Sequence, residues 1–127
     1  MRWIVLVLLL VPVHCFSQKE KLIECDDFYN RITSDGSIYI VDIRLHDEYQ
    51  ENRITDAHWG GNKETFKKML IDINKKSPVF LYCEKGKRTK ECAVWLRSLG
   101  YKNVYQLKGG FREWIQNGYP VDTSSIK

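Results

Sequence analysis

Two short runs of apolar residues, each followed by a polar, helix-forming segment, restrict the fold of this 127-residue chain most strongly. Residues 38–43 (IYIVDI) and 78–82 (PVFLY) contain a single charged side chain between them. A strand with one wet face alternates apolar and polar residues, whereas an unbroken apolar run is typical of a strand covered on both faces. Parallel strands joined by helices provide that cover, so the two runs predict an α/β domain.

The remaining segments continue the alternation of strands and helices. In chain order, the further elements expected are a strand at 22–23, helices at 26–31, 47–51, 62–73 and 89–99, a strand at 104–107, a tight turn at 109–110 and a helix at 111–117. Residues 52–61 are expected to be irregular. The sequence therefore predicts one α/β domain over residues 18–127, with a mainly parallel sheet and helices on both faces. In such sheets ligands bind beyond the C-terminal ends of the strands.

The first seventeen residues differ from the rest of the chain. Met1 and Arg2 precede an apolar run from Trp3 to Val13, which is shorter than a membrane-spanning helix and typical of a signal peptide. We expect cleavage after Ser17, export to the periplasm or the extracellular space, and no stable membrane insertion after cleavage. An uncleaved anchor and a lipid-modified Cys15 are the alternatives.

Charge and cysteine content narrow the function further. The net charge of +4 at pH 7 is spread along the chain and does not indicate nucleic-acid binding. Cys25, Cys83 and Cys92 would remain after cleavage, an odd number in a compartment that permits disulfides. At least one thiol is therefore free, paired with another molecule or used in chemistry. His46 and His58 are too few and too far apart to predict a metal site, and no cofactor is expected.

The loop 83–88 (CEKGKR), between a buried strand and a helix, is the strongest candidate for a site. Backbone N–H groups converge in such loops and, together with the helix N-terminus, favour an anion. Gly86 permits the positive φ that a tight curl requires. The cationic side chains around the loop belong to Lys85, Lys87 and Arg88. These features favour the thiolate form of Cys83 over the thiol; an inert, buried cysteine is the alternative.

With Thr89 included, the loop resembles the active-site loop of the rhodanese family, C-x-x-G-x-R followed by Ser or Thr. Other family segments are matched by IVDIR at 40–44 with Glu48-Tyr49, AVWLRSLG at 93–100, and LKGGF at 107–111 with Trp114. Residues 53–57 (RITDA) depart from the family's H-I-P-G-A. This departure concerns the loop beside the pocket, and hence substrate preference, more than the fold.

The resemblance implies a sulfurtransferase. The Cys83 thiolate would attack the outer sulfur of a donor such as thiosulfate, become a persulfide, and pass the sulfur to a thiol or to cyanide. Arg88 and Lys87 would bind the small anionic donor, with Lys85 as a further candidate. Thr89 would either hydrogen-bond the thiolate or cap the following helix. A protein sulfur donor or acceptor is a further partner that the resemblance allows.

Other polar and aromatic residues are interpreted as structural. Asp42, Arg44 and Glu48 are expected to form structural ion pairs, with Arg44 and Glu48 at helix spacing, and a second polar site is the alternative. Cys92 lies among apolar residues of the helix 89–99, where packing is its expected role. Phe111 and Trp114 are expected in the core.

Two other functions compete with a sulfurtransferase. In a sulfur-relay or sensor module, Cys83 would accept persulfide sulfur from a partner protein without turning over a small substrate. A phosphatase is the second alternative, but phosphatases resembling this fold place five residues between cysteine and arginine. Here four residues separate Cys83 from Arg88, which suits a persulfide better than a phosphoryl group. The chain contains no C-x-x-C pair, so a general disulfide oxidoreductase is not indicated.

Overall fold

A computed structural model describes residues 21–126 of the chain. The expected signal segment and its cleavage position lie outside these residues. The strands are β1 (Leu22–Ile23), β2 (Tyr39–Asp42), β3 (His58–Trp59), β4 (Val79–Tyr82) and β5 (Val104–Leu107), and the helices are α1 (Cys25–Ser34), α2 (His46–Glu51), α3 (Lys63–Leu70), α4 (Thr89–Ser98) and α5 (Gly110–Gln116). Within residues 21–126, no helix has the length and apolar character needed to cross a membrane.

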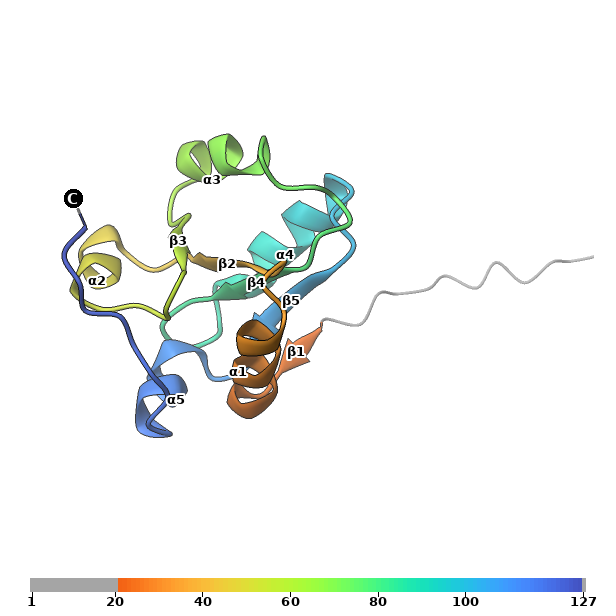
Figure 1. Ribbon diagram of the computed structural model, residues 1–127. Helices are drawn as coiled ribbons and strands as arrows, with labels where there is room; N and C mark the ends of the chain where they lie inside the picture. The colour runs from red at the N-terminus through yellow and green to blue at the C-terminus, as the bar shows by residue number, and fades with distance from the viewer. Residues whose placement is uncertain (1–20, 127) are drawn as a thin grey trace, which may run out of the picture.

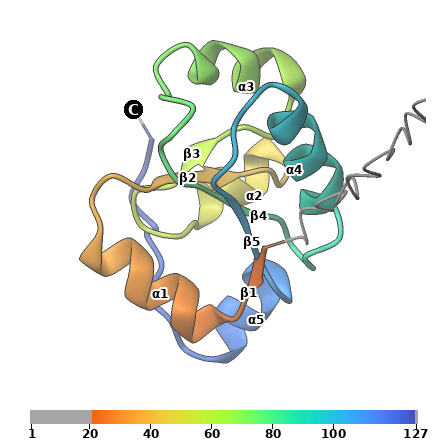
Figure 2. The ribbon, with the colours of Figure 1, turned by 90° about the vertical axis from the view of Figure 1, so that its right-hand side faces the viewer.

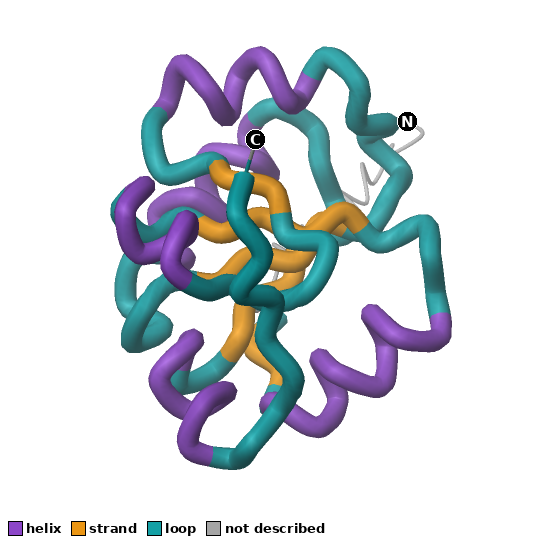
Figure 3. Tube along the Cα trace, turned by 60° about the vertical axis from the view of Figure 1, so that its left-hand side comes forward, coloured by secondary structure: helices purple, strands orange, loops and turns teal. Residues whose placement is uncertain are grey.

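The five strands form one sheet in the order β1-β5-β4-β2-β3, and every named pairing is parallel. Helices α1 and α5 cover one face, and α3 and α4 cover the other (Figures 1 and 2). In Figure 3 the strands lie between these two layers of helices. The predicted α/β class, the parallel sheet and the helices on both faces are therefore confirmed.

Two hydrophobic clusters explain why the strand sequences are apolar on both sides. Successive residues of a strand point to opposite faces of the sheet. In β4, Val79 and Leu81 join Phe66 of α3 in one cluster, while Phe80 and Tyr82 join the aromatic cluster of α1 and α5. All four β4 side chains are at most 1 % exposed, and each such burial contributes about 1.5–3 kcal/mol. Phe111 and Trp114 are buried in the second cluster, as predicted.

The structure corrects the prediction that residues 52–61 are wholly irregular. His58–Trp59 forms the edge strand β3, which pairs with β2 through Val41 and Asp42. Two residues carry too little pattern to indicate a strand, so tertiary contacts define it. The Trp59 indole N–H donates to the carbonyl of Arg44 at 2.9 Å, and the N–H of Gly60 donates to the carbonyl of Asp42 at 2.9 Å. Smaller differences concern helix ends, since α1 is longer and α3 shorter than expected.

Candidate active site

Cys83 directly follows the last residue of β4, Tyr82, and so lies at the C-terminal ends of the parallel strands, as predicted. The register of β2 against β4 pairs Asp42 with Tyr82, so the chain leaving β2 runs beside Cys83. Cys83 is 2 % exposed, and its Sγ accepts a hydrogen bond from the backbone N–H of Gly86 at 3.1 Å. Gly86 has φ +80°, the conformation that the tight loop was expected to require. The loop 83–88 therefore curls around the sulfur.

The N-terminus of α5 holds this loop from outside. The amide N–H groups of Phe111 and Arg112 donate to the carbonyl oxygens of Cys83 and Glu84, at 2.8 and 3.0 Å. These are amides that have no partner within their own helix. Because these two carbonyl groups are hydrogen-bonded to α5, they point away from the pocket. The loop therefore presents backbone N–H groups, such as that of Gly86, to the Cys83 sulfur.

Gly110 makes this contact sterically feasible, which gives a testable prediction. A Cβ at position 110 would lie 2.6 Å from the carbonyl oxygens of both Cys83 and Glu84, and its φ is +66°. We expect Gly110→Ala to lower the free energy of unfolding by about 2–4 kcal/mol, because it combines a backbone clash with an unfavourable φ. Urea denaturation measures this. Gly36→Ala is the control, since nothing lies within 4 Å of its Cβ position, and a change above about 1 kcal/mol there would contradict the steric argument.

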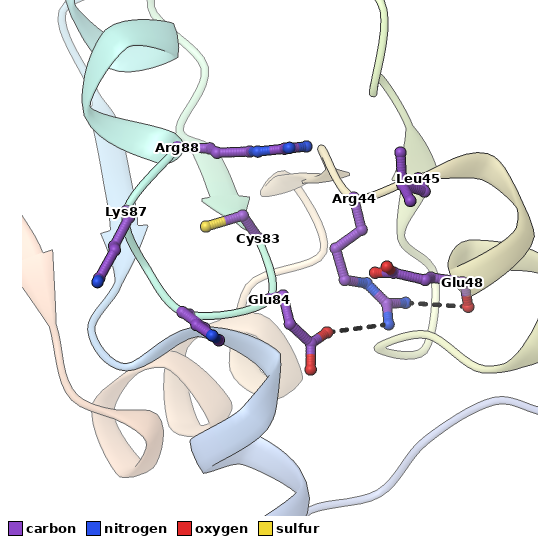
Figure 4. A pocket seen from close by; sticks show the side chains of 8 residues that line it. Arg44, Leu45, Glu48, Cys83, Glu84, Lys87 and Arg88 are labelled. Carbon is purple, nitrogen blue, oxygen red and sulfur yellow. Dashed lines mark hydrogen bonds and ion pairs between the residues drawn. The ribbon is translucent and has the colours of Figure 1, made fainter.

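A pocket of about 240 Å³ opens on Cys83. It is lined by Arg44, Leu45, Glu48, Cys83, Glu84, Lys85, Lys87 and Arg88. Figure 4 shows the Arg88 side chain extending across the pocket, whereas the Lys87 side chain points away from Cys83. The loop residues predicted to bind an anion thus share one pocket wall, but Arg88 is better placed over it than Lys87.

Arg88 lies at the start of α4 and makes no side-chain cap there. Within residues 21–126 its guanidinium forms no hydrogen bond or ion pair, and the ammonium groups of Lys85 and Lys87 form none either. None of these three positive charges is therefore neutralised by a partner within residues 21–126.

The Thr89 hydroxyl has neither of the two roles predicted for it. Thr89 is completely buried, and its hydroxyl has no hydrogen-bond partner among the described residues. It is the first residue of α4 and not its cap residue. Neither the predicted bond to the Cys83 sulfur nor the predicted capping bond is formed.

Asp42 and Arg44 form a buried ion pair that supports the pocket wall. Arg44 Nη2 lies 2.7 Å from Asp42 Oδ2, and Nε donates to both carboxylate oxygens at 3.0–3.1 Å. The guanidinium also lies 3.9 Å from the ring centroid of Phe111. Burial lowers the pKa of Arg44, but hydrogen bonding to Asp42 and the charge of its carboxylate outweigh burial and raise it. Arg44 is therefore a fixed, charged part of the site.

The pairing of Arg44 with Glu48 was predicted wrongly. Arg44 precedes α2 instead of lying in it, and its guanidinium donates to the main-chain carbonyl of Glu48 at 3.4 Å while the carboxylate that it binds is that of Asp42. The second carboxylate near Arg44 belongs to Glu84, at 3.8 Å. Leu45 and Glu84 were not identified as pocket residues. Arg44 and Glu48 were interpreted as structural, and the alternative of a polar site is the one that places them at the pocket. A signal for these residues existed, because α2 follows β2 and β2 is the neighbour of β4 in the sheet. Using that signal required the strand order, which the sequence did not provide.

The other cysteines and the histidines lie apart from this pocket. Cys25, Cys83 and Cys92 all have free thiols. Burial raises the pKa of Cys25, and it raises that of Cys92 to about 12. Cys92 packs against the core cluster of α3 and α4, as predicted. His58 stacks on Tyr39 with ring centroids 4.3 Å apart. Residues 21–126 contain no cluster of three side chains suited to hold a metal ion.

The chain is similar in sequence to known proteins over most of its length. The family model of the rhodanese-like domain matches residues 24–117. The thiosulfate sulfurtransferase GlpE of Actinobacillus pleuropneumoniae is 31 % identical over 85 residues, which cover 67 % of this chain and 78 % of that protein. The tRNA uridine(34) hydroxylase of Pelagibacter ubique is 32 % identical over 92 residues, or 70 % of this chain. The match covers only 30 % of the hydroxylase.

Solved structures agree on the fold. A rhodanese-related protein from Thermoplasma volcanium superposes with a TM-score of 0.70 at 25 % identity, covering 82 % of this chain and 99 % of that one. A thiosulfate sulfurtransferase from Pseudomonas aeruginosa gives a TM-score of 0.73 at 18 % identity, covering 84 % of this chain and 20 % of that one.

Proposed function

Because this chain belongs to the rhodanese-like domain family, we propose that it is a sulfurtransferase in which Cys83 carries the transferred sulfur as a persulfide. One observation supports this most directly. The Cys83 sulfur accepts a hydrogen bond from the Gly86 N–H at 3.1 Å, beneath a pocket whose cationic loop side chains have no partner within residues 21–126. That arrangement suits an anionic sulfur and an anionic donor in the same small space. The match to a thiosulfate sulfurtransferase is consistent with thiosulfate as the donor.

The proposed first step forms one sulfur–sulfur bond and breaks another. The Cys83 thiolate attacks the outer sulfur of thiosulfate, the bond between the two thiosulfate sulfurs breaks, and sulfite leaves with the electron pair. The product is an anionic Cys83 persulfide, so the total charge is unchanged. The Gly86 N–H and the N-terminal end of α4 would stabilise this anion, while Arg88 would stabilise the charge on the departing sulfite.

In the second step, a thiolate or cyanide attacks the outer sulfur of the persulfide. The new bond forms to the acceptor, the persulfide S–S bond breaks, and the Cys83 thiolate is regenerated. The sulfur moves at constant oxidation state, so neither step requires a redox cofactor. In the alternative of a relay module, the donor would be the persulfide of a partner protein, and no small substrate would be turned over.

Mass spectrometry tests the proposal. The purified protein, treated with thiosulfate and freed of excess reagent, is expected to gain the mass of one sulfur atom. Peptide mapping should locate that sulfur on Cys83, and cyanide should remove it with release of thiocyanate. An unchanged mass after prolonged treatment with thiosulfate would contradict thiosulfate as donor, and sulfur located on another cysteine would contradict the site.

A further inference from the structure

The pocket at Cys83 carries opposite charges on its two sides. Arg88 comes from the loop, while Glu48 of α2 and the loop residue Glu84 both lie beside Arg44 (Figure 4). Arg44 lies between the two carboxylates. Its charge is already matched by Asp42 at 2.7 Å, so it does not neutralise them fully.

Glu48 is the more informative of the two carboxylates. It is half-buried, and its carboxylate has no hydrogen bond or ion pair with any residue in the range 21–126. Figure 4 shows it reaching from α2 toward Arg44, on the side of Arg44 away from Cys83, and it lines the Cys83 pocket. Glu84 is held only by a long contact, 3.8 Å, to Arg44, and its side chain is 49 % exposed. A carboxylate without a partner at the border of a reaction pocket is available to bind a cation.

A second hollow extends this negative region. It has a volume of about 460 Å³ and shares Arg44, Glu48 and Glu84 with the Cys83 pocket. Glu51 adds a further carboxylate, and Arg112 is a basic residue that lines this hollow together with Arg44. The two hollows meet at Glu48 and Glu84, so an acceptor larger than the first pocket has room on the acidic side.

We propose that the sulfur acceptor is an aminothiol, a thiol whose protonated amine lies close to its sulfur and binds Glu48 and Glu84. This inference rests on the proposed persulfide chemistry and specifies its second substrate. The cationic side of the pocket serves the anionic donor, and the acidic side serves the cationic acceptor. The acceptor thiolate attacks the outer persulfide sulfur, Cys83 leaves as thiolate, and the product is the persulfide of the aminothiol. The ammonium group offsets the repulsion between a thiolate and an anionic persulfide.

Three thiols of similar size test the charge preference directly. Cysteamine is cationic, 2-mercaptoethanol is neutral and mercaptoacetate is anionic. Cys83 is first loaded with sulfur by thiosulfate, or by inorganic polysulfide if thiosulfate does not react, and discharge is followed by mass spectrometry. Each rate is divided by that of the same thiol with a small-molecule persulfide, which removes differences in intrinsic nucleophilicity. We expect cysteamine to exceed 2-mercaptoethanol by about fivefold, and mercaptoacetate to be slowest.

Glu48→Gln is the decisive variant, because the amide has the shape of the carboxylate and no native bond is lost. It should remove most of the cysteamine preference, and adding Glu84→Gln should remove the rest. Asp47→Asn is the matched control, with the same charge change in the same helix at a residue that lines neither hollow. Its preference should change by less than about twofold. An equal cysteamine preference in Glu48→Gln and wild type, or none in wild type, would overturn the proposal.

A second measurement separates this inference from the proposed function. Aminoethyl, hydroxyethyl and sulfonatoethyl methanethiosulfonates convert a thiolate to a mixed disulfide without any persulfide. If Glu48 and Glu84 bind an ammonium group, Glu48→Gln should slow the aminoethyl reagent relative to the hydroxyethyl reagent, whether or not thiosulfate loads Cys83. Normal loading with no dependence on Glu48 in either assay would refute the aminothiol acceptor and leave the sulfurtransferase standing. If thiosulfate fails to load Cys83 while the reagent rates still depend on Glu48, thiosulfate is not the donor, but the binding of an ammonium group by Glu48 stands.

Discussion

Replacing Cys83 with serine is expected to lower sulfur transfer from thiosulfate to cyanide by a factor on the order of 10⁴ or more. A serine hydroxyl does not ionise near neutral pH and cannot form the sulfur–sulfur bond that stores the transferred atom. The substitution is nearly isosteric at a buried position, so the fold should survive. Thiocyanate production measures the loss, and circular dichroism verifies the fold.

Cys92→Ser is the control for this experiment. Burial raises the pKa of Cys92 to about 12, so at neutral pH it remains a thiol and is a poor nucleophile. Cys92 also lines a different hollow, beside Phe66 and Trp95. The variant should therefore keep nearly the wild-type rate of transfer. Wild-type activity in Cys83→Ser, or its loss in Cys92→Ser, would show that the sulfur is carried elsewhere.

The sequence predicted the parts of the fold that depend on local pattern. β2 and β4 were predicted because burial on both faces requires an unbroken apolar run. α5 was predicted because the glycine pair 109–110 indicates a turn before it, although the helix begins one residue earlier than expected, at Gly110. β3 was missed because two residues, His58 and Trp59, cannot show a pattern. Contacts from Asp42 and Arg44 determine it.

The same distinction applies to the candidate site. The wall made by residues 83–88 was predicted, because a loop that is continuous in sequence is visible in the sequence. The opposite wall was not, because Leu45 and Glu48 belong to another βα connection and approach Cys83 only through the pairing of β2 with β4. The direction of a side chain is equally invisible in sequence. Lys87 and Arg88 are adjacent and both cationic, but only Arg88 crosses the pocket (Figure 4).

That difference makes Arg88→Ala the second informative substitution. Arg88 has no bond to lose within residues 21–126 and no capping role in α4, so its removal should affect the donor and not the fold. We expect thiosulfate turnover to fall about thirtyfold, the lower end of the range for a charged transition-state contact, because the side chain is exposed to solvent. Arg88→Lys should recover part of the rate, since one ammonium cannot reproduce the two-pronged contact of guanidinium with an oxyanion.

Lys87→Ala provides the comparison, since it removes the same charge from the neighbouring residue. The Lys87 side chain points away from Cys83, so the loss of turnover in Lys87→Ala should be several-fold smaller than in Arg88→Ala. It should nearly vanish at high salt, because Lys87 contributes only long-range attraction and salt screens that attraction. Steady-state kinetics with thiosulfate at low and high ionic strength measure both variants, and the rate with a neutral alkylating reagent reports whether Cys83 itself is intact. Equal losses in the two variants would mean that the loop attracts the donor only by its total charge. Wild-type thiosulfate kinetics in Arg88→Ala would remove Arg88 from the site. They would also favour a relay, because a sulfur atom delivered on a partner's persulfide brings no sulfite for a guanidinium to bind.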